Sequence, residues 1–183
     1  MSDIVSACRV ALRAPDLIDA PALFALIDQD RDHLRTWLPW VDKTLSIADS
    51  RQFLAGVLEG RRDGAPCRHW LIEADGELAG CIDLHALSGQ HRHGSLGYWL
   101  ASRCSGRGVM TQAVSQVLDI AFGEMGLHRV ALVAGAANHR SRAVASRLDF
   151  ALEGVMREYL HLHDRYFDAS LYSMLASQWA ARR

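Results

Sequence analysis

The chain has 183 residues, 50% of them hydrophobic, and a formal net charge of −1. This composition suits one domain, residues 1–183, with its own core, and the near-neutral charge argues against a surface that binds nucleic acid or an anionic membrane. No apolar run is long enough to cross a membrane and the first ten residues lack a signal-peptide pattern, so we expect a cytoplasmic protein.

The first third of the sequence predicts a strand followed by helices. We expect residues 9–12 to form the strand, and Asp19-Ala20-Pro21 is typical of a helix start. Pro39 must interrupt any helix that reaches it. Ser46, with Asp49 three residues later, approximates a capping box and predicts a further helix.

The middle of the chain predicts antiparallel strands. Residues 69–74 and 78–84 are expected to be strands, and Asp75-Gly76 between them is a strong hairpin signal. Residues 89–94 form a polar turn before a third strand at 95–100. The hairpin and this third strand therefore begin a sheet.

The last third alternates between helices and strands. We predict helices at 108–122 and 139–148, a strand at 129–134 between them, and closing strands at 151–161 and 166–175. Strands that are first antiparallel and then interleaved with helices indicate an α/β protein with a mixed sheet and helices on both faces.

A loop with two glycines carries the clearest chemical signal. Gly106 and Gly108 follow the strand at 95–100 and open an amphipathic helix. Glycine lets the backbone approach a ligand closely, and the free amides of a helix start favour phosphate. No Gly-Lys-Ser/Thr follows, and Thr111 stands where a dinucleotide motif has its third glycine, so the loop alone is more typical of a tight turn than of a phosphate site.

The wider pattern resembles one family. The phrase LGYWLxxxxxGxGxMTxAV is similar to motif A of the GCN5-related N-acetyltransferases, the GNAT superfamily, and in particular to the branch with the ribosomal-protein N-terminal alanine and serine acetyltransferases, the Rim enzymes. Ser105 departs from the usual Gln or Arg at the start of the loop, and Asp149 replaces a usual glycine. Further segments resemble the same branch at residues 33–40, 126–130, 138–150, 153–158 and 168–175.

The resemblance implies a seven-stranded mixed sheet that splays open between the fourth and fifth strands, where acetyl-CoA lies as the acetyl donor. Ser141 then stands where the family places a hydroxyl near the leaving sulfur, although Asn138 and Ser141 are also typical helix-capping residues. Arg103 and Arg107 would add contacts to the pyrophosphate, or simply be solvated. The donor site implied by the resemblance comprises Leu100, Arg103, Ser105, Gly106, Arg107, Gly108, Val109, Met110, Thr111, Asn138 and Ser141.

The general base is not evident from the sequence. Relatives carry an acid at one of two positions, which here are Ser95 and Leu160. Asp83 and His85 project from one face of their strand, which makes His85 one candidate, although a strand histidine is more often structural. Glu158, expected on the same face as Leu160, is the other candidate. Ordered water could also carry the proton.

The acceptor would be recognised by the N-terminal helices and the central strand. We expect Arg35, Trp37, Trp40 and Tyr98 to border the acceptor amine. Core packing is an equally good account of the two tryptophans.

We expect neither a metal ion nor a disulfide. His91-x-His93 and His161-x-His163 lie beside no Cys or acidic cluster at a zinc spacing. The four cysteines form no CxxC pair and are expected to be free thiols.

The leading hypothesis is an acetyl-CoA-dependent N-acetyltransferase that works by direct attack of a primary amine. The N-terminal α-amine of a protein, such as a ribosomal protein, is the preferred acceptor. A small-molecule amine or antibiotic acetyltransferase, a catalytically silent acyl-CoA-binding protein and a nucleotide-binding protein remain alternatives. The resemblance also implies a homodimer.

Overall fold

The protein is described by a computed structural model that covers residues 8–64 and 67–182. Its sheet contains β1 (Val10–Arg13), β2 (Arg68–Ala74), β3 (Glu77–Ser88), β4 (His93–Leu100), β5 (Arg129–Gly135), β6 (Ala151–Leu162) and β7 (Arg165–Leu175). Its α-helices are α1 (Ala20–Gln29), α2 (Arg31–Arg35), α3 (Ile47–Arg62), α4 (Val109–Asp119), α5 (His139–Arg147) and α6 (Ala176–Ala181). Short 3₁₀ or π turns span Leu17–Asp19, Pro39–Lys43, Ser102–Cys104 and Ile120–Glu124.

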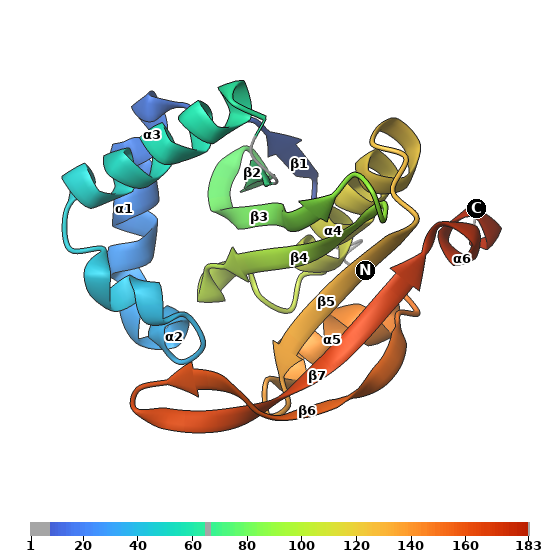
Figure 1. The fold of residues 1–183 in the computed structure, drawn as a ribbon. Helices are drawn as coiled ribbons and strands as arrows, with labels where there is room; N and C mark the ends of the chain where they lie inside the picture. Colours follow the sequence, from blue (N-terminus) through green and yellow to red (C-terminus); the bar gives the residue numbers. More distant parts are fainter. Residues whose placement is uncertain (1–7, 65–66, 183) are drawn as a thin grey trace, which may run out of the picture.

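The seven strands form one mixed sheet in the order β1-β2-β3-β4-β5-β7-β6 (Figure 1). All neighbours are antiparallel except β4 and β5, which are parallel. This parallel pairing extends only from His93 and Arg129 to Leu96 and Leu132. Beyond that point the two strands diverge, which confirms the expected opening between the fourth and fifth strands.

Helices cover both faces of the sheet, and alternate strand residues divide between two cores. Ile82 and its neighbours pack with the apolar face of α4, including Val114. Leu71 faces the opposite side and packs with Leu23 of α1 and Leu54 of α3. Each fully buried aliphatic side chain contributes roughly 1.5–3 kcal/mol. The sheet is therefore held from both sides, as the α/β prediction required.

Local capping signals are confirmed. The Ser46 hydroxyl accepts from the Asp49 amide at 3.3 Å, while the Asp49 carboxylate accepts from the Leu45 amide at 2.9 Å, so α3 begins where the sequence predicts. Asp75 and Gly76 both adopt positive φ, 54° and 85°, as a tight hairpin requires.

Helix α6 was not predicted from the sequence, because a six-residue segment after a strand carries little periodicity. The Trp179 indole donates to Asp119 at 2.8 Å, and this tertiary contact fixes α6 against the end of α4.

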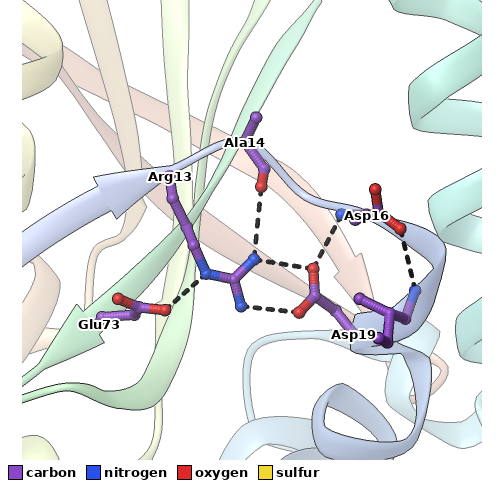
Figure 2. A network of polar contacts seen from close by, with 6 residues as sticks. Arg13, Ala14, Asp16, Asp19 and Glu73 are labelled. Carbon is purple, nitrogen blue, oxygen red and sulfur yellow. Dashed lines mark hydrogen bonds and ion pairs between the residues drawn. The ribbon is translucent and has the colours of Figure 1, made fainter.

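Arg13 joins the edge of the sheet to the N-terminal helical layer (Figure 2). Its guanidinium donates to both carboxylate oxygens of Asp19 at 2.7 and 2.8 Å, and its Nε donates to Glu73 at 2.5 Å. The bond from Arg13 lowers the pKa of Asp19, which is only 7% exposed. Removing Arg13 would leave the buried Asp19 carboxylate without its ion-pair partner. Within the described residues, no helix combines the length and hydrophobicity needed to span a membrane.

Candidate active site

A cavity of about 790 Å³ occupies the opening between β4 and β5. The ends of these two strands form its floor, and the glycine-containing loop, the first turns of α4 and one face of α5 form one side. Helix α2 and Leu160 of β6 form the other side. This size is ample for an extended ligand of several hundred Å³.

The loop presents backbone rather than side chains to the cavity. Gly106 and Gly108 both line it and adopt positive φ, 77° and 76°, a conformation that costs other residues about 1–2 kcal/mol. The first bond of α4 runs from the Gln112 amide to the Gly108 carbonyl at 3.1 Å. Preceding amides of a helix start have no intrahelical acceptor, so they are available to an anion. Ser105, Val109, Met110 and Thr111 also line the cavity.

The edge of β4 offers further amides at the opening. The Ala101 amide donates to the carbonyl oxygen of Ala79 in β3 at 2.8 Å. Because the amides of successive strand residues point to opposite edges, those of Leu100 and Tyr98 face the side from which β5 has departed. Both residues line the cavity. The splayed strands thus leave donors beside the ligand space.

Tyr98, Ser141 and Asn138 form a connected polar group in the cavity wall. The Tyr98 and Ser141 hydroxyl oxygens lie 2.9 Å apart, and the Asn138 side chain accepts from the Ser141 amide at 3.1 Å. Burial raises the pKa of Tyr98 to about 12, against the opposing effect of the bond to Ser141. The phenol therefore keeps its proton near neutral pH.

Two arginines of α5 line the cavity and were missed by the sequence analysis. Arg140, Val144 and Arg147 stand at i, i+4 and i+7, so one face of the helix presents all three. Arg147 also reaches Thr111 at 3.4 Å. The spacing was visible in the sequence, and combining it with the glycine loop could have identified these cations.

The side of the cavity formed by α2 and Leu160 depends on contacts between distant segments. The Trp37 ring lies against Gly135, where an added Cβ would be 2.3 Å from the ring, and its centroid is 6.4 Å from that of Phe167. The turn between β6 and β7 lies beside α2 (Figure 1), with His163 Nε2 2.6 Å from the Arg35 carbonyl oxygen. Trp37, His33, Leu34 and Leu38 line this side.

The two arginines predicted to contact the pyrophosphate lie outside the cavity lining. Arg103 donates to Glu77 at 3.1 Å and to the Leu78 carbonyl at 2.9 Å. Arg107 donates to Asp75 at 2.5 Å. Both side chains turn toward the β2–β3 hairpin because its carboxylates are closer than the ligand space. The positive charge at the cavity comes from α5 instead.

Two predicted acceptor residues also lie outside the lining. Arg35 donates to both carboxylate oxygens of Asp42, at 3.1 and 3.0 Å. Its guanidinium is therefore engaged in an ion pair on the surface. The Trp40 ring packs on Trp99 with 6.0 Å between centroids. This packing matches the alternative of a structural tryptophan.

His85 is held by a neighbour on its own strand and is absent from the cavity lining. Its Nδ1 lies 2.7 Å from Asp83. This hydrogen bond raises the pKa of His85 despite partial burial. The two side chains share a face, as the alternation of the strand predicts.

Glu158 also lies outside the lining, because β6 is irregular at this point. The pairing with β7 jumps from Met156 to Leu160, and Glu158 adopts φ 51° with its amide bonded to Asp168 at 2.8 Å. The regular alternation assumed in the sequence analysis is therefore wrong here. Leu160 faces the cavity and Glu158 does not share its position.

The cysteines are free thiols, and the paired histidines contact other aromatic rings. Cys8, Cys67, Cys81 and Cys104 are all free. The rings of His91 and His93 stack 6.0 Å apart, whereas His161 packs on Tyr166.

Comparisons of the sequence and of the structure with known proteins all find acetyltransferases. A model of the acetyltransferase (GNAT) domain matches residues 9–151. The candidate ribosomal N-acetyltransferase YdaF of Bacillus subtilis is 33% identical over 95% of both chains. The ribosomal-protein-serine acetyltransferase of Escherichia coli is 29% identical over 84% of this chain and 85% of its own. The structure of RimL, a ribosomal L7/L12 α-N-protein acetyltransferase in complex with coenzyme A, superposes with a TM-score of 0.87 at 27% identity and covers 92% of this chain and 95% of its own.

Proposed function

Because the chain belongs to the GNAT acetyltransferase family, we propose that it transfers acetyl from acetyl-CoA to the α-amine of a protein N-terminus, with a ribosomal protein as the preferred acceptor. N-acetyl transfer from acetyl-CoA follows from the family. The acceptor is the finer part of the proposal. One observation supports the proposal most directly. The cavity opens where β4 diverges from β5, with the glycine-containing loop on one side and Trp37 on the other.

The donor would lie across the opening with its pyrophosphate on the amides of residues 106–111. Arg140 and Arg147 would add charge-assisted hydrogen bonds to the phosphates. The Asn138 side chain, which caps α5, would steady the strand end beside the pantetheine arm. The thioester then reaches the exposed edge of β4.

Attack of the amine nitrogen on the thioester carbon forms the new C–N bond and places negative charge on the carbonyl oxygen. The Tyr98 or Leu100 amide would stabilise this oxyanion, as preorganised donors do in acyl transfer. The C–S bond then breaks. Ser141, hydrogen-bonded to Tyr98, would donate a hydrogen bond to the departing thiolate, and the proton lost by the amine nitrogen would reach the sulfur through solvent.

The acceptor amine needs little help in losing its proton. An α-amine has a pKa of about 7.7–8.0, so a useful fraction is neutral at physiological pH. His85 and Glu158 lie outside the cavity lining, and we therefore assign the proton to solvent. A side-chain amine, with a pKa of about 10.4, would react poorly without a base.

The charge of the cavity favours a protein N-terminus over a polyamine or a cationic antibiotic. Its basic lining residues are His33, Arg140 and Arg147, and no carboxylate lines it within the described part of the chain. Polycations need acidic partners to offset their desolvation. The relatives named for ribosomal-protein substrates support the same choice. Among small-molecule acceptors, a neutral amine therefore remains the first alternative to a protein N-terminus.

A thiol-release assay with acetyl-CoA tests the proposal. The acceptors are peptides with N-terminal Ser, Ala or Met, the same peptides with a blocked α-amine, free amino acids, spermidine and an aminoglycoside. We expect release with unblocked peptides. Ser141→Ala should lower kcat about 10- to 100-fold, whereas Ser146→Ala, an exposed serine on the same helix, should leave it unchanged.

Other outcomes would redirect the assignment. Release with small amines alone would make the protein a small-molecule acetyltransferase. Coenzyme A binding without release on any acceptor would make it a binding protein.

The remaining features of the proposal concern location and assembly. Four free thiols and a ribosomal acceptor suit the cytoplasm. Strand β6 is an edge strand with exposed apolar side chains, among them Leu152, Val155 and Tyr159, and a homodimer would cover them. Light scattering of the purified protein tests this assembly.

A further inference from the structure

Four side chains able to bind a metal ion share one face of the β2–β3 hairpin, outside the cavity. His69 on β2 stands directly opposite Asp83 on β3. Cys67 immediately precedes β2, and continuing the register places it opposite His85. Because strand residues two apart face the same side, the hairpin itself brings the four together.

The distances suit a tetrahedral metal ion. Cys67 Sγ lies 3.6 Å from His69 Nδ1, and one ligand atom from each of Cys67, His69 and Asp83 lies within 4.8 Å of the others. Zinc bonds of about 2.3 Å to sulfur and 2.0–2.1 Å to nitrogen place these two atoms about 3.5 Å apart at a tetrahedral angle.

The surroundings hold the ligands in place. His85 Nδ1 donates to the Asp83 carboxylate at 2.7 Å, which fixes the carboxylate. Gly97 on β4 leaves the space for that carboxylate, since a Cβ there would lie 2.7 Å from Asp83 Oδ2. The Phe53 ring stacks edge-on against His69 with 5.6 Å between centroids. A carboxylate–histidine contact of this kind is typical of the support around metal ligands.

Binding of an ion would change the protonation of Cys67. Burial raises the pKa of Cys67 to about 11 and lowers the pKa of His69. Without metal, the thiol and the imidazole are therefore both neutral at pH 7. The imidazole can bind an ion directly, whereas the thiol must release one proton as its sulfur–metal bond forms.

We propose that Cys67, His69 and Asp83 bind a zinc-type divalent ion, with water in the fourth position and His85 positioning the carboxylate. The mixture of one sulfur, one imidazole and one carboxylate suits zinc better than calcium or magnesium. The ion would link the segment that follows α3 to β3. It lies outside the acetyl-transfer cavity, so its effect would be on stability.

Cobalt titration of chelator-treated protein tests the site, because a cobalt–thiolate bond gives a charge-transfer absorption. We expect one Co²⁺ per chain, displaced by Zn²⁺, with about one proton released per ion at pH 7. Cys67→Ser should abolish the charge-transfer band and weaken Zn²⁺ binding at least 100-fold. His85→Ala should weaken it about 10- to 100-fold while keeping the band.

Two controls separate this site from other thiols and histidines. Cys8→Ser removes a thiol that bonds Asp75 at the other end of the hairpin, and His91→Ala/His93→Ala removes the stacked surface pair. Both variants should bind Zn²⁺ as the wild type does. Absence of the band in the wild type, its persistence in Cys67→Ser or its loss in either control would overturn the proposal.

Thermal unfolding distinguishes loss of the metal site from loss of the fold in the variants. Without metal, Cys67→Ser should unfold at the wild-type temperature, and Zn²⁺ should raise the Tm of the wild type alone. If Cys67→Ser is unstable without metal, the near-isosteric Asp83→Asn replaces it. Wild-type Zn²⁺ affinity in Asp83→Asn would then contradict the site.

Discussion

The two sides of the cavity are built in different ways. The donor side, residues 105–111 and 138–147, consists of two short continuous segments that present backbone amides and one helix face. The proposed acceptor side, α2 with Leu160 of β6, is assembled from segments more than 100 residues apart and is held together by the contact of the β6–β7 turn with Arg35. Local sequence determines the first side, and packing between distant elements determines the second.

This difference has a functional meaning. Acetyl-CoA is common to the family, and a site made of glycines and amides tolerates few changes. The acceptor varies, and a slot held by a few contacts such as Trp37 on Gly135 can change one side chain at a time. The following substitutions break or sharpen this contrast, starting with the largest expected effect.

Gly108→Glu should destroy the donor side. Gly108 adopts φ 76° at the start of α4, where a side chain costs about 1–2 kcal/mol and a carboxylate repels phosphate. We expect coenzyme A affinity, measured by calorimetry, to fall on the order of 100-fold. Gly126→Glu is the matched control, because Gly126 has φ 60° beyond the other end of α4. Equal losses in both variants would refute a specific role for Gly108.

Gly135→Ala should damage the acceptor side alone. The new methyl group would lie 2.3 Å from the Trp37 ring and displace it, at an overpacking cost of about 1–3 kcal/mol. KM for the peptide should rise about tenfold, with coenzyme A affinity within about twofold of wild type. Gly154→Ala, at a strand glycine with open space around it, should change neither. A larger loss of coenzyme A than of peptide binding would contradict the division into two sides.

The Arg140→Gln/Arg147→Gln double variant should weaken coenzyme A binding about tenfold, with a smaller loss at high salt. Arg103→Gln/Arg107→Gln should have less effect, because these side chains are engaged by the hairpin. Coenzyme A affinity is measured by titration at two ionic strengths. A larger loss in Arg103→Gln/Arg107→Gln than in Arg140→Gln/Arg147→Gln would support the pyrophosphate contacts predicted from the sequence.

Glu153→Gln should affect neither side of the cavity, only the pH dependence of stability. Bonds from Arg129 and Ser173 lower the pKa of Glu153 to about 2. A lowered pKa stabilises the fold fully above about pH 4.5, and this contribution is lost as pH falls through 2. Because Glu153 is 35% exposed, we expect only about 1 kcal/mol. Urea unfolding should show that difference at pH 7 and little at pH 2; a constant difference would contradict the assignment.

The fold and the position of the glycine loop at the start of α4 were predictable from the sequence because their signals are local. Asp75-Gly76, Ser46 and the two loop glycines each impose a backbone conformation within a few residues. The positions of Arg103 and Arg107 could not be predicted, since the side chains follow carboxylates that only the folded hairpin brings close. Glu158 was misplaced for a related reason: a bulge in β6 is fixed by pairing with β7, and period-two alternation does not reveal it.

The divergence of β4 from β5 after Leu96 leaves the sheet incomplete until a ligand arrives. Coenzyme A would then act as a substitute strand, covering amides that otherwise exchange their hydrogens with water. A ligand present at 100 times its Kd stabilises the native state by about 2.7 kcal/mol. The resistance of this protein to unfolding would therefore rise with the concentration of coenzyme A around it.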